Sequence, residues 1–213
     1  MNDKTKTVAV VVAHPDDETL WAGGTMLSNP GKNYFVASLC RKNDHDRAPK
    51  FAQALEAFGA DGSMSDLEDG PEQIPLADEV VEKAIQQLLP ARQYDMAITH
   101  SIYGEYTRHR RHEEVGRAMI RLWASGGLQI GELWAFAYSD EGRTHLPLAD
   151  QGAALYCPLS QDIWEKKYNV ITTIYGFDKN SWEAQTTPKA EAFRQFFKAS
   201  EAIAWMEGGN RTL

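Results

Sequence analysis

VAVVVAHPDDETLWAGG, residues 8–24, joins a run of small apolar residues to a cluster of polar ones. The apolar run from Val8 to Ala13 predicts a buried β-strand, and the segment that begins at Asp17 predicts a helix. Open α/β sheets place their binding sites where a strand ends and the next helix begins. The stretch therefore favours an α/β fold with a functional site at the carboxyl edge of its sheet.

The polar residues of this junction have the types and the spacing of a metal site. His14 and Asp17 stand three positions apart, so a tight turn can bring both side chains to one point. The side chains of the neighbours Asp16 and Asp17 diverge, so one carboxylate can bind a metal while the other stays free. Acidic residues also favour the first turn of a helix without any further role. That alternative explains neither His14 nor the doubled carboxylate.

Predicted strands and helices alternate through the first two thirds of the chain. The strands are expected at 8–13, 34–40, 94–99 and 130–138, and the helices at 17–27, 47–58, 76–90, 112–124, 161–173 and 188–205. Asp46 is the expected N-cap of its helix, and 61–75 is expected as a loop with a short strand near Met64. Such alternation is typical of a Rossmann-like, doubly wound, mostly parallel sheet with helices on both faces. We expect a single domain, residues 1–213.

Composition excludes several classes of protein. Hydrophobic residues make up 43% of the 213 and charged residues 24%, as in an ordinary globular protein. The net charge of −8 argues against general nucleic-acid binding, which favours basic domains. The first residues lack a hydrophobic signal region, and the apolar run after them is too short to span a bilayer. Cys40 and Cys157 form no disulfide framework, and Cys40 is expected as a small hydrophobic residue. We expect a cytoplasmic protein without a membrane span, and leave open a homo-oligomer.

A second group of histidines follows the predicted strand at 94–99. The segment HSIYGEYTRHRRHEEVG, residues 100–116, contains His109 and His112 at the start of an amphipathic helix. A catalytic zinc usually has three protein ligands, and His14 with Asp17 supplies two. A loop at the same edge of the sheet should supply the third. The alternative is a basic, solvated helix start. His100 is expected to be structural or to support the site.

Ala13–Glu18, AHPDDE, resembles the signature of the LmbE-like, or PIG-L, family of metal-dependent N-acetylglucosaminyl de-N-acetylases. That family also carries a second motif, commonly GxYGHPDH, whose last histidine binds metal and whose first assists catalysis. The resemblance maps the ligand to His112 and the catalytic imidazole to His109. This chain has one residue more between Tyr106 and His109 than the common pattern, and Arg111 stands where the family usually has an acid.

The resemblance also implies contacts to substrate. In some members an arginine that opens the second helix and an aspartate in the next loop contact sugar hydroxyls; Arg47 and Asp69 match them here. From its position beside His112, we expect Arg111, with Arg110, to face the mouth of the site and attract an anionic substrate group. Glu113 is expected to support a protonated His109, because it lies four residues later on the helix. Tyr175 and Trp182 are the aromatic residues most expected to border a sugar.

Together these residues predict a zinc-dependent hydrolase that removes an acetyl group from an N-acetylated amino sugar, with Fe²⁺ as another suitable metal. His14, Asp17 and His112 would bind the ion, which lowers the pKa of a bound water and polarises the carbonyl. Asp16 would act as general base, and His109 would stabilise the oxyanion or protonate the leaving nitrogen.

Two alternatives remain open: an amidase acting on a non-acetyl amide, and a catalytically decayed metal- or glycan-binding protein. A non-haem iron oxygenase also uses two histidines and one carboxylate. Its usual ligand spacing and all-β setting do not match a strand-to-helix turn.

Overall fold

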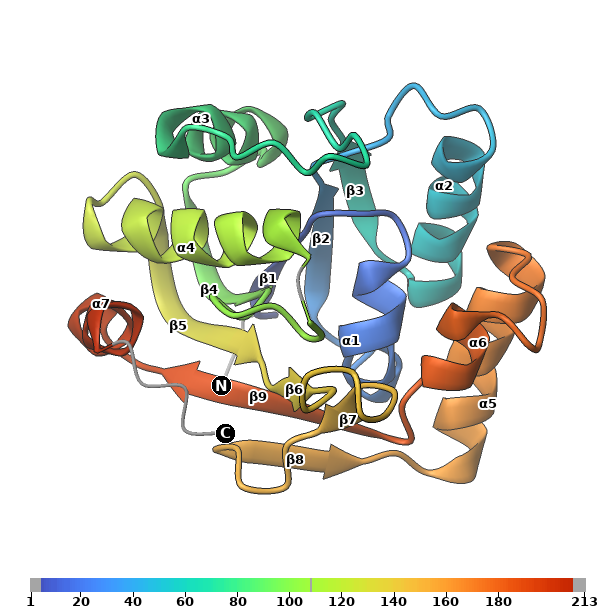
Figure 1. Ribbon diagram of the computed structural model, residues 1–213. Helices are drawn as coiled ribbons and strands as arrows, with labels where there is room; N and C mark the ends of the chain where they lie inside the picture. The colour runs from blue at the N-terminus through green and yellow to red at the C-terminus, as the bar shows by residue number, and fades with distance from the viewer. Residues whose placement is uncertain (1–4, 108, 209–213) are drawn as a thin grey trace.

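A seven-stranded sheet runs through the middle of the molecule (Figure 1), in a computed structural model that describes residues 5–107 and 109–208. Its strands lie in the order β3-β2-β1-β4-β5-β9-β8. The bounds are Thr7–Val12 for β1, Asn33–Ser38 for β2, Asp61–Met64 for β3, Gln93–Thr99 for β4, Gln129–Phe136 for β5, Leu155–Pro158 for β8 and Ala190–Phe196 for β9. Strands β1 to β5 are parallel, and β9 is antiparallel to both β5 and β8. The expected α/β fold with a mostly parallel sheet is confirmed.

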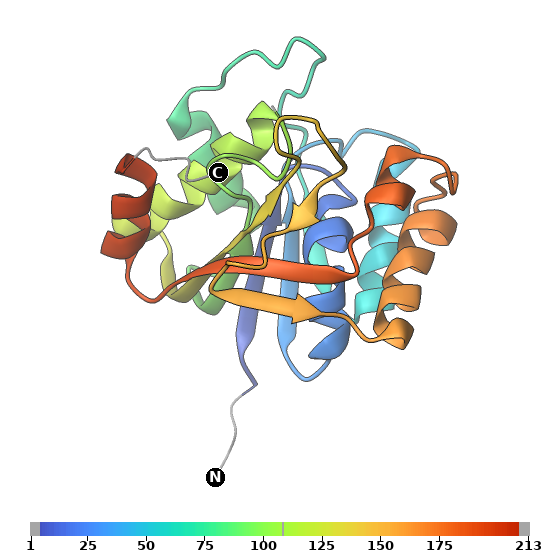
Figure 2. The same cartoon turned by 60° about the horizontal axis from the view of Figure 1, so that its bottom comes forward.

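Helices cover both faces of the sheet (Figure 2). One face carries α3, α4 and α7; the other carries α1, α2, α5 and α6. The helices are α1 Asp17–Ser28, α2 Arg47–Phe58, α3 Asp78–Leu88, α4 Arg110–Ala124, α5 Gln161–Asn169, α6 Trp182–Thr186 and α7 Ala199–Glu207, and a π-helical turn, η1, covers Val170–Ile174. The short strands β6 (Tyr138–Ser139) and β7 (Leu148–Ala149) pair beside the main sheet. No helix of the described residues is both long and apolar enough to cross a bilayer.

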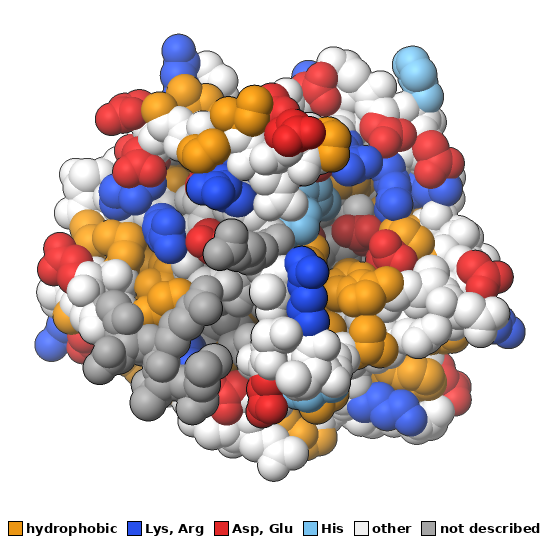
Figure 3. Space-filling view, in the orientation of Figure 1, with side chains coloured by type: hydrophobic (Ala, Val, Ile, Leu, Met, Phe, Trp, Pro, Cys, Tyr) orange, Lys and Arg blue, Asp and Glu red, His pale blue; other side chains and the backbone are white. Residues whose placement is uncertain are grey.

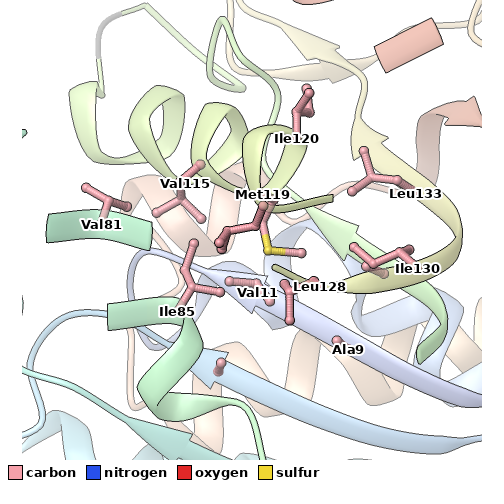
Figure 4. Close-up of a cluster of buried hydrophobic side chains, with 14 of the residues drawn as sticks. Ala9, Val11, Val81, Ile85, Val115, Met119, Ile120, Leu128, Ile130 and Leu133 are labelled. Carbon is pink, nitrogen blue, oxygen red and sulfur yellow. The ribbon is translucent and has the colours of Figure 1, made fainter. Parts of the chain in front are cut away.

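The apolar run of β1 is continuous because both of its faces are buried. Ala9 and Val11 point to the core beneath α3 and α4, where Figure 4 shows Val11 close to Met119 and Ile85. Val10, the residue between them, belongs to the second core on the face of α1 and α2. A strand covered on both sides has no polar face, which is why it reads as an unbroken apolar run instead of an alternating one.

The sheet topology brings two loops together at one edge. β1 and β4 are parallel neighbours in register, with Val11 opposite Thr99. From β1 the chain crosses to β2 on one side, whereas β4 lies on the other side. The loops that follow β1 and β4 therefore leave at a topological switch point, where α/β sheets bind ligands.

The predicted helix at 188–205 is wrong. Residues 190–196 form strand β9, and only Ala199–Glu207 is helical. Alanine, glutamate, lysine and glutamine favour a helix locally, but β9 pairs with strands on both of its sides and buries Phe193 completely. Tertiary pairing outweighs local propensity in this segment.

The start of α2 also differs from the expectation. Asp46 occupies the N-cap position, but its side chain caps nothing. The Asp44 carboxylate instead accepts hydrogen bonds from the backbone N–H groups of Asp46 (2.9 Å) and Arg47 (3.0 Å). The polar turn before α2 thus provides the cap from two residues further upstream.

Candidate metal centre

The turn between β1 and α1 fixes the carboxylate of Asp17. Its Oδ2 accepts a hydrogen bond from the backbone N–H of His14 at 2.9 Å, and its Oδ1 accepts one from Trp21 Nε1 at 3.0 Å. Asp16, at the same turn, has a φ of 123°. A non-glycine residue in that region is strained, and such strain persists where the surrounding structure over-determines it, often at functional sites. The turn is thus built to hold these side chains in fixed directions.

Three donor atoms from the two loops converge beside this turn. Asp17 Oδ2 lies 3.2 Å from His14 Nδ1 and 3.2 Å from His112 Nε2, and the two nitrogens are 3.3 Å apart. A tetrahedral zinc ion with bonds of about 2.0–2.1 Å separates its ligand atoms by roughly 3.3–3.4 Å. The triangle formed by His14, Asp17 and His112 therefore has the size that one small divalent cation requires.

Carboxylates lie beside the outer nitrogens of both imidazoles. Glu105 Oε2 lies 2.5 Å from Nδ1 of His112, and Asp69 Oδ2 lies 3.1 Å from Nε2 of His14. Glu105 favours a hydrogen on the outer nitrogen of His112, which directs the inner nitrogen of that ring toward the centre. The Asp69 contact is an ion-pair distance, and Nε2 of His14 makes no hydrogen bond to the described protein groups. Metal-binding histidines commonly have such outer carboxylates, which set the tautomer and raise the basicity of the ligand.

His100 completes a stack of three imidazole rings. Its Nε2 accepts a hydrogen bond from the backbone N–H of Ala13 at 3.0 Å, so its Nδ1 carries the hydrogen that is donated to Glu105 at 2.9 Å. The ring of His112 lies between His100 and His109, with centroids 3.9 Å and 4.3 Å away. His100 is fully buried and supports the site from beneath, as expected.

The buried charges shift the proton affinities of this cluster. Burial alone would lower the pKa of His112, but the carboxylates of Asp17 and Glu105 outweigh it and raise that pKa to about 9. Burial would raise the pKa of Glu105, but His100 and His112 lower it to about 2. Burial, together with His112 and His14, lowers the pKa of His109 to about 3. In the metal-free centre His112 is therefore protonated at pH 7 between two ionised carboxylates, and a bound divalent cation would take the place of its inner proton.

Asp16 and His109 lie beside the triangle, and a ring nitrogen of His109 lies within 4.8 Å of donor atoms of His14 and His112, so His109 is a further candidate ligand. Asp16 Oδ2 is 3.2 Å from Arg47 Nη1. Burial and the adjacent Asp17 raise the pKa of Asp16 well above its ordinary value, and Arg47 opposes that rise. The ring of His109 packs 4.5 Å from that of His14, and its buried Nδ1 makes no hydrogen bond to the described protein groups. Asp16 and His109 are therefore available to a molecule bound next to the centre.

The expectation that Arg111 faces the mouth of the site is wrong. Its side chain is fully buried. The guanidinium donates to the backbone oxygens of Glu68 (2.5 Å) and Ile74 (2.8 Å), and it binds the carboxylates of Glu68 and Glu114. Arg111 thus ties the loop after β3 to α4, so its hydrogen-bonding groups are occupied and it has no free charge to offer a substrate.

Glu113 does not support His109 either. Helix α4 begins at Arg110, so His109 is its N-cap with an extended backbone and not a member of the helix. The spacing of four residues brings side chains together only within a helix. Glu113 instead lies 3.4 Å from the guanidinium of Arg117.

Glu105, which lies inside the segment 100–116, is not among the residues that the sequence predicts for the site, although it contacts both His100 and His112. Glu105 lies in a loop, five residues after His100 and seven before His112. Neither helical nor strand periodicity therefore predicts its contacts with these histidines. Of the two aromatic residues expected at the site, Tyr175 is buried and donates to Glu18 at 2.8 Å. Trp182 is 37% exposed and lines a pocket together with His109.

An α/β sheet with two histidines and one carboxylate converging at its carboxyl edge defines the class of this chain: a Rossmann-like protein with a candidate metal centre. Its fold is that of the LmbE/PIG-L-type deacetylases. No family model matches the sequence. An uncharacterized protein, L374, of Acanthamoeba polyphaga mimivirus is 23% identical over 127 residues, which are 53% of this chain and 56% of that protein. The chain thus spans little more than half of the curated relative that it matches.

Solved structures with this fold include deacetylases and a hydratase. An N,N′-diacetylchitobiose deacetylase from Pyrococcus horikoshii has a TM-score of 0.70 and 16% identity over 95% of this chain and 86% of its own. GalB, the 4-carboxy-2-hydroxymuconate hydratase of Pseudomonas putida, has a TM-score of 0.62 and 16% identity, covering 91% and 97%. The zinc-inhibited form of the teicoplanin deacetylase Orf2 has a TM-score of 0.58 and 14% identity, covering 84% and 88%. At these identities the likeness establishes the fold and leaves the reaction to be inferred from the site.

Proposed function

We propose that this chain is a zinc-dependent hydrolase that removes the acetyl group from an N-acetylated amino sugar. The observation that carries the proposal is the triangle of His14, Asp17 and His112, with Asp16 and His109 beside it. Two imidazoles and one carboxylate form an established ligand set of catalytic zinc. Fe²⁺ accepts the same donors.

The protein groups around the centre have separate tasks in amide hydrolysis. A divalent ion bound by the triangle would act as a Lewis acid toward the amide carbonyl and lower the pKa of a water molecule. Asp16, whose carboxylate lies outside the triangle, takes the proton of the attacking water. Arg47 keeps Asp16 in place through their ion pair.

His109 acts on the substrate from the other side. The pKa of about 3 makes its imidazole neutral at rest, so it stabilises the developing oxyanion as a hydrogen-bond donor. His109 lines the pocket of about 500 Å³ beside the centre, where a substrate can contact its ring.

Asp69 and Arg47 are the proposed contacts to sugar hydroxyls. Asp69 lines a shallow pocket of about 380 Å³ together with Arg41. Its Oδ2 faces His14 and Arg41 at 3.1 and 3.2 Å. We therefore assign the hydroxyl contact to the other oxygen, Oδ1.

Metal analysis combined with acetate release tests this function. The wild-type protein should bind one Zn²⁺ and release acetate from one or more members of a panel of N-acetylglucosaminides. Asp16→Asn should keep its metal and lose about 10²- to 10⁴-fold in turnover, the usual loss for a general base. Retained metal in Asp17→Asn with loss of metal in Asp16→Asn would reverse the two roles.

The same panel separates the alternatives. Acyl release only from longer N-acyl groups would identify an amidase of another specificity. Because the fold also carries a hydratase, metal binding without hydrolysis of any amide would contradict the proposed reaction while leaving the metal centre intact.

A further inference from the structure

A pocket beside the metal centre has features that the deacetylation chemistry does not use. It has a volume of about 500 Å³ and includes His109 in its wall. Tyr106 and Trp182 form one side, with ring centroids 4.8 Å apart, and Tyr106 also packs 5.4 Å from His112. An aromatic surface therefore leads from the centre outward. Figure 3 shows hydrophobic and basic side chains near the histidine surface in the middle of this face.

The other side of the pocket is a strained loop that presents Arg143. Glu141, Gly142 and Arg143 all have positive φ values, of 46°, 73° and 73°. Two of them are not glycine, so their conformation is strained and must be held by its surroundings.

Asp140 is the group that holds this loop. Its Oδ1 accepts hydrogen bonds from Gly142 N (3.1 Å) and Thr107 Oγ1 (2.7 Å), and its Oδ2 accepts one from Thr107 N (2.7 Å). Both oxygens are thereby occupied. Asp140 fixes the loop against the segment that leads to His109, so the position of Arg143 is coupled to the wall of the centre.

Within the described part of the chain, the guanidinium of Arg143 has no acidic partner. Among the residues that the structure describes, no carboxylate lies within ion-pair distance of it, although the exposed Arg41 and the half-exposed Arg117 each have one. The chain as a whole carries a net charge of −8. The net negative charge of the protein repels anions, whereas a cation at the rim of a pocket attracts them locally.

We propose that this pocket binds the aglycone of the amino sugar and that Arg143 selects an anionic one, with Trp182 as the stacking surface for the sugar. The proposal rests on the proposed function for the identity of the sugar. Phosphate and carboxylate groups share the chemistry that a guanidinium recognises. A neutral aglycone would leave Arg143 unused.

Binding of deacetylated products tests the proposal without requiring turnover. Calorimetry should show that glucosamine 1-phosphate, or a glucosaminide of a hydroxy acid, binds the metal-loaded protein more tightly than methyl glucosaminide. Arg143→Ala should remove that preference, about 10- to 100-fold for a charge-assisted contact. Arg92→Ala is the matched control, because Arg92 is exposed at the amino end of β4, on the opposite edge of the sheet. Trp182→Ala should lower the affinity for all of these sugars, because it removes the stacking surface. Trp182→Phe should restore part of that affinity.

The outcomes separate this proposal from the function on which it rests. A preference for anions that persists in Arg143→Ala, or no preference in the wild type, would overturn the assignment of Arg143. Acetate release that is insensitive to Arg143 would leave the deacetylase intact and reject the pocket. Anion-selective product binding without acetate release from any glucosaminide would reject the deacetylase and support the pocket.

Discussion

At the scale of residues, the centre depends on which nitrogen of each histidine carries a hydrogen. Glu105 and Asp69 stand on the outer sides of His112 and His14, so both inner nitrogens can present lone pairs to the same point as Asp17 once a metal replaces the inner proton of His112. Two lone pairs and a carboxylate oxygen at 3.2–3.3 Å repel one another unless a cation or a shared proton lies between them. The carboxylates hold such a proton on His112 in the absence of a metal, with a pKa of about 9, and a divalent cation at the same point can replace it.

The two histidines of the second motif should separate metal binding from catalysis. His112→Ala should lose the ion, because it removes one of three ligands. His109→Ala should keep the ion and lose activity, because its ring stacks on His112 outside the triangle. Titration of both variants with Zn²⁺ measures the difference. Equal affinities would show that His112 is not the third ligand.

Glu105→Gln should weaken zinc affinity about 10- to 100-fold, the usual effect of losing an outer carboxylate. The amide can still accept a hydrogen bond from His112 but no longer strengthens its basicity with a full charge. Glu113→Gln is the matched control, since among the residues that the structure describes its carboxylate forms an ion pair with the half-exposed Arg117 alone. Unchanged zinc affinity in a folded Glu105→Gln protein would leave Glu105 a purely structural residue.

At the scale of elements, a buried ion pair fastens α1 and α5 to the late strand β9. Glu191, on β9, accepts from Lys167 Nζ at 2.7 Å and from the backbone N–H groups of Gly24 and Thr25, each at 2.7 Å. Lys167 and Glu191 are fully buried. A Cβ atom on Gly24 would lie 2.5 Å from Leu159 and 2.9 Å from Glu191. Glycine at this position allows α1 to approach the carboxylate.

Glu191→Ala should destabilise the protein by about 3–5 kcal/mol, because it leaves the charge of Lys167 buried without a partner. Adding Lys167→Met should recover a large part of that loss. Glu165→Ala, at an exposed position of α5, is the control and should cost little. Urea unfolding gives the free energies. A double variant as unstable as Glu191→Ala alone would show that the carboxylate acts through the backbone of α1 instead.

At the scale of the whole molecule, the centre exists only when two distant loops meet. His14 and Asp17 follow β1, whereas His112 follows β4, 98 positions beyond His14. The parallel pairing of β1 with β4 closes that distance. The unfolded chain lacks this arrangement, so an ion that binds the folded centre stabilises the fold by mass action.

Removal of the metal should therefore lower the Tm. At a zinc concentration of about a thousand times the Kd, binding contributes roughly 4 kcal/mol, which corresponds to a shift of about 10 °C for a chain of this length. Thermal melts with and without a chelator measure it. His112→Ala should show no such shift; an equal shift in that variant would place the ion elsewhere.

The sequence by itself determined the local elements and the first half of the centre. The sequence combines an apolar run with a tight turn and a helix, and few folds are compatible with that pattern. It therefore predicts β1, α1 and the proximity of His14 and Asp17. Helix α2 has the predicted bounds, 47–58. Asp17 needs only its own turn for its direction, because the backbone N–H of His14 and the side chain of Trp21 lie within four residues.

Only the tertiary structure decided what depends on contacts between distant segments. Residues 190–196 have the composition of a helix and became a strand because β5 and β8 pair with them. Arg111 seemed free beside the ligand histidine and is instead enclosed by the loop after β3. Glu105 gained its role by reaching His100 and His112 across a loop. Local propensity and spacing act over a few residues, whereas burial and pairing select among side chains that the sequence places far apart.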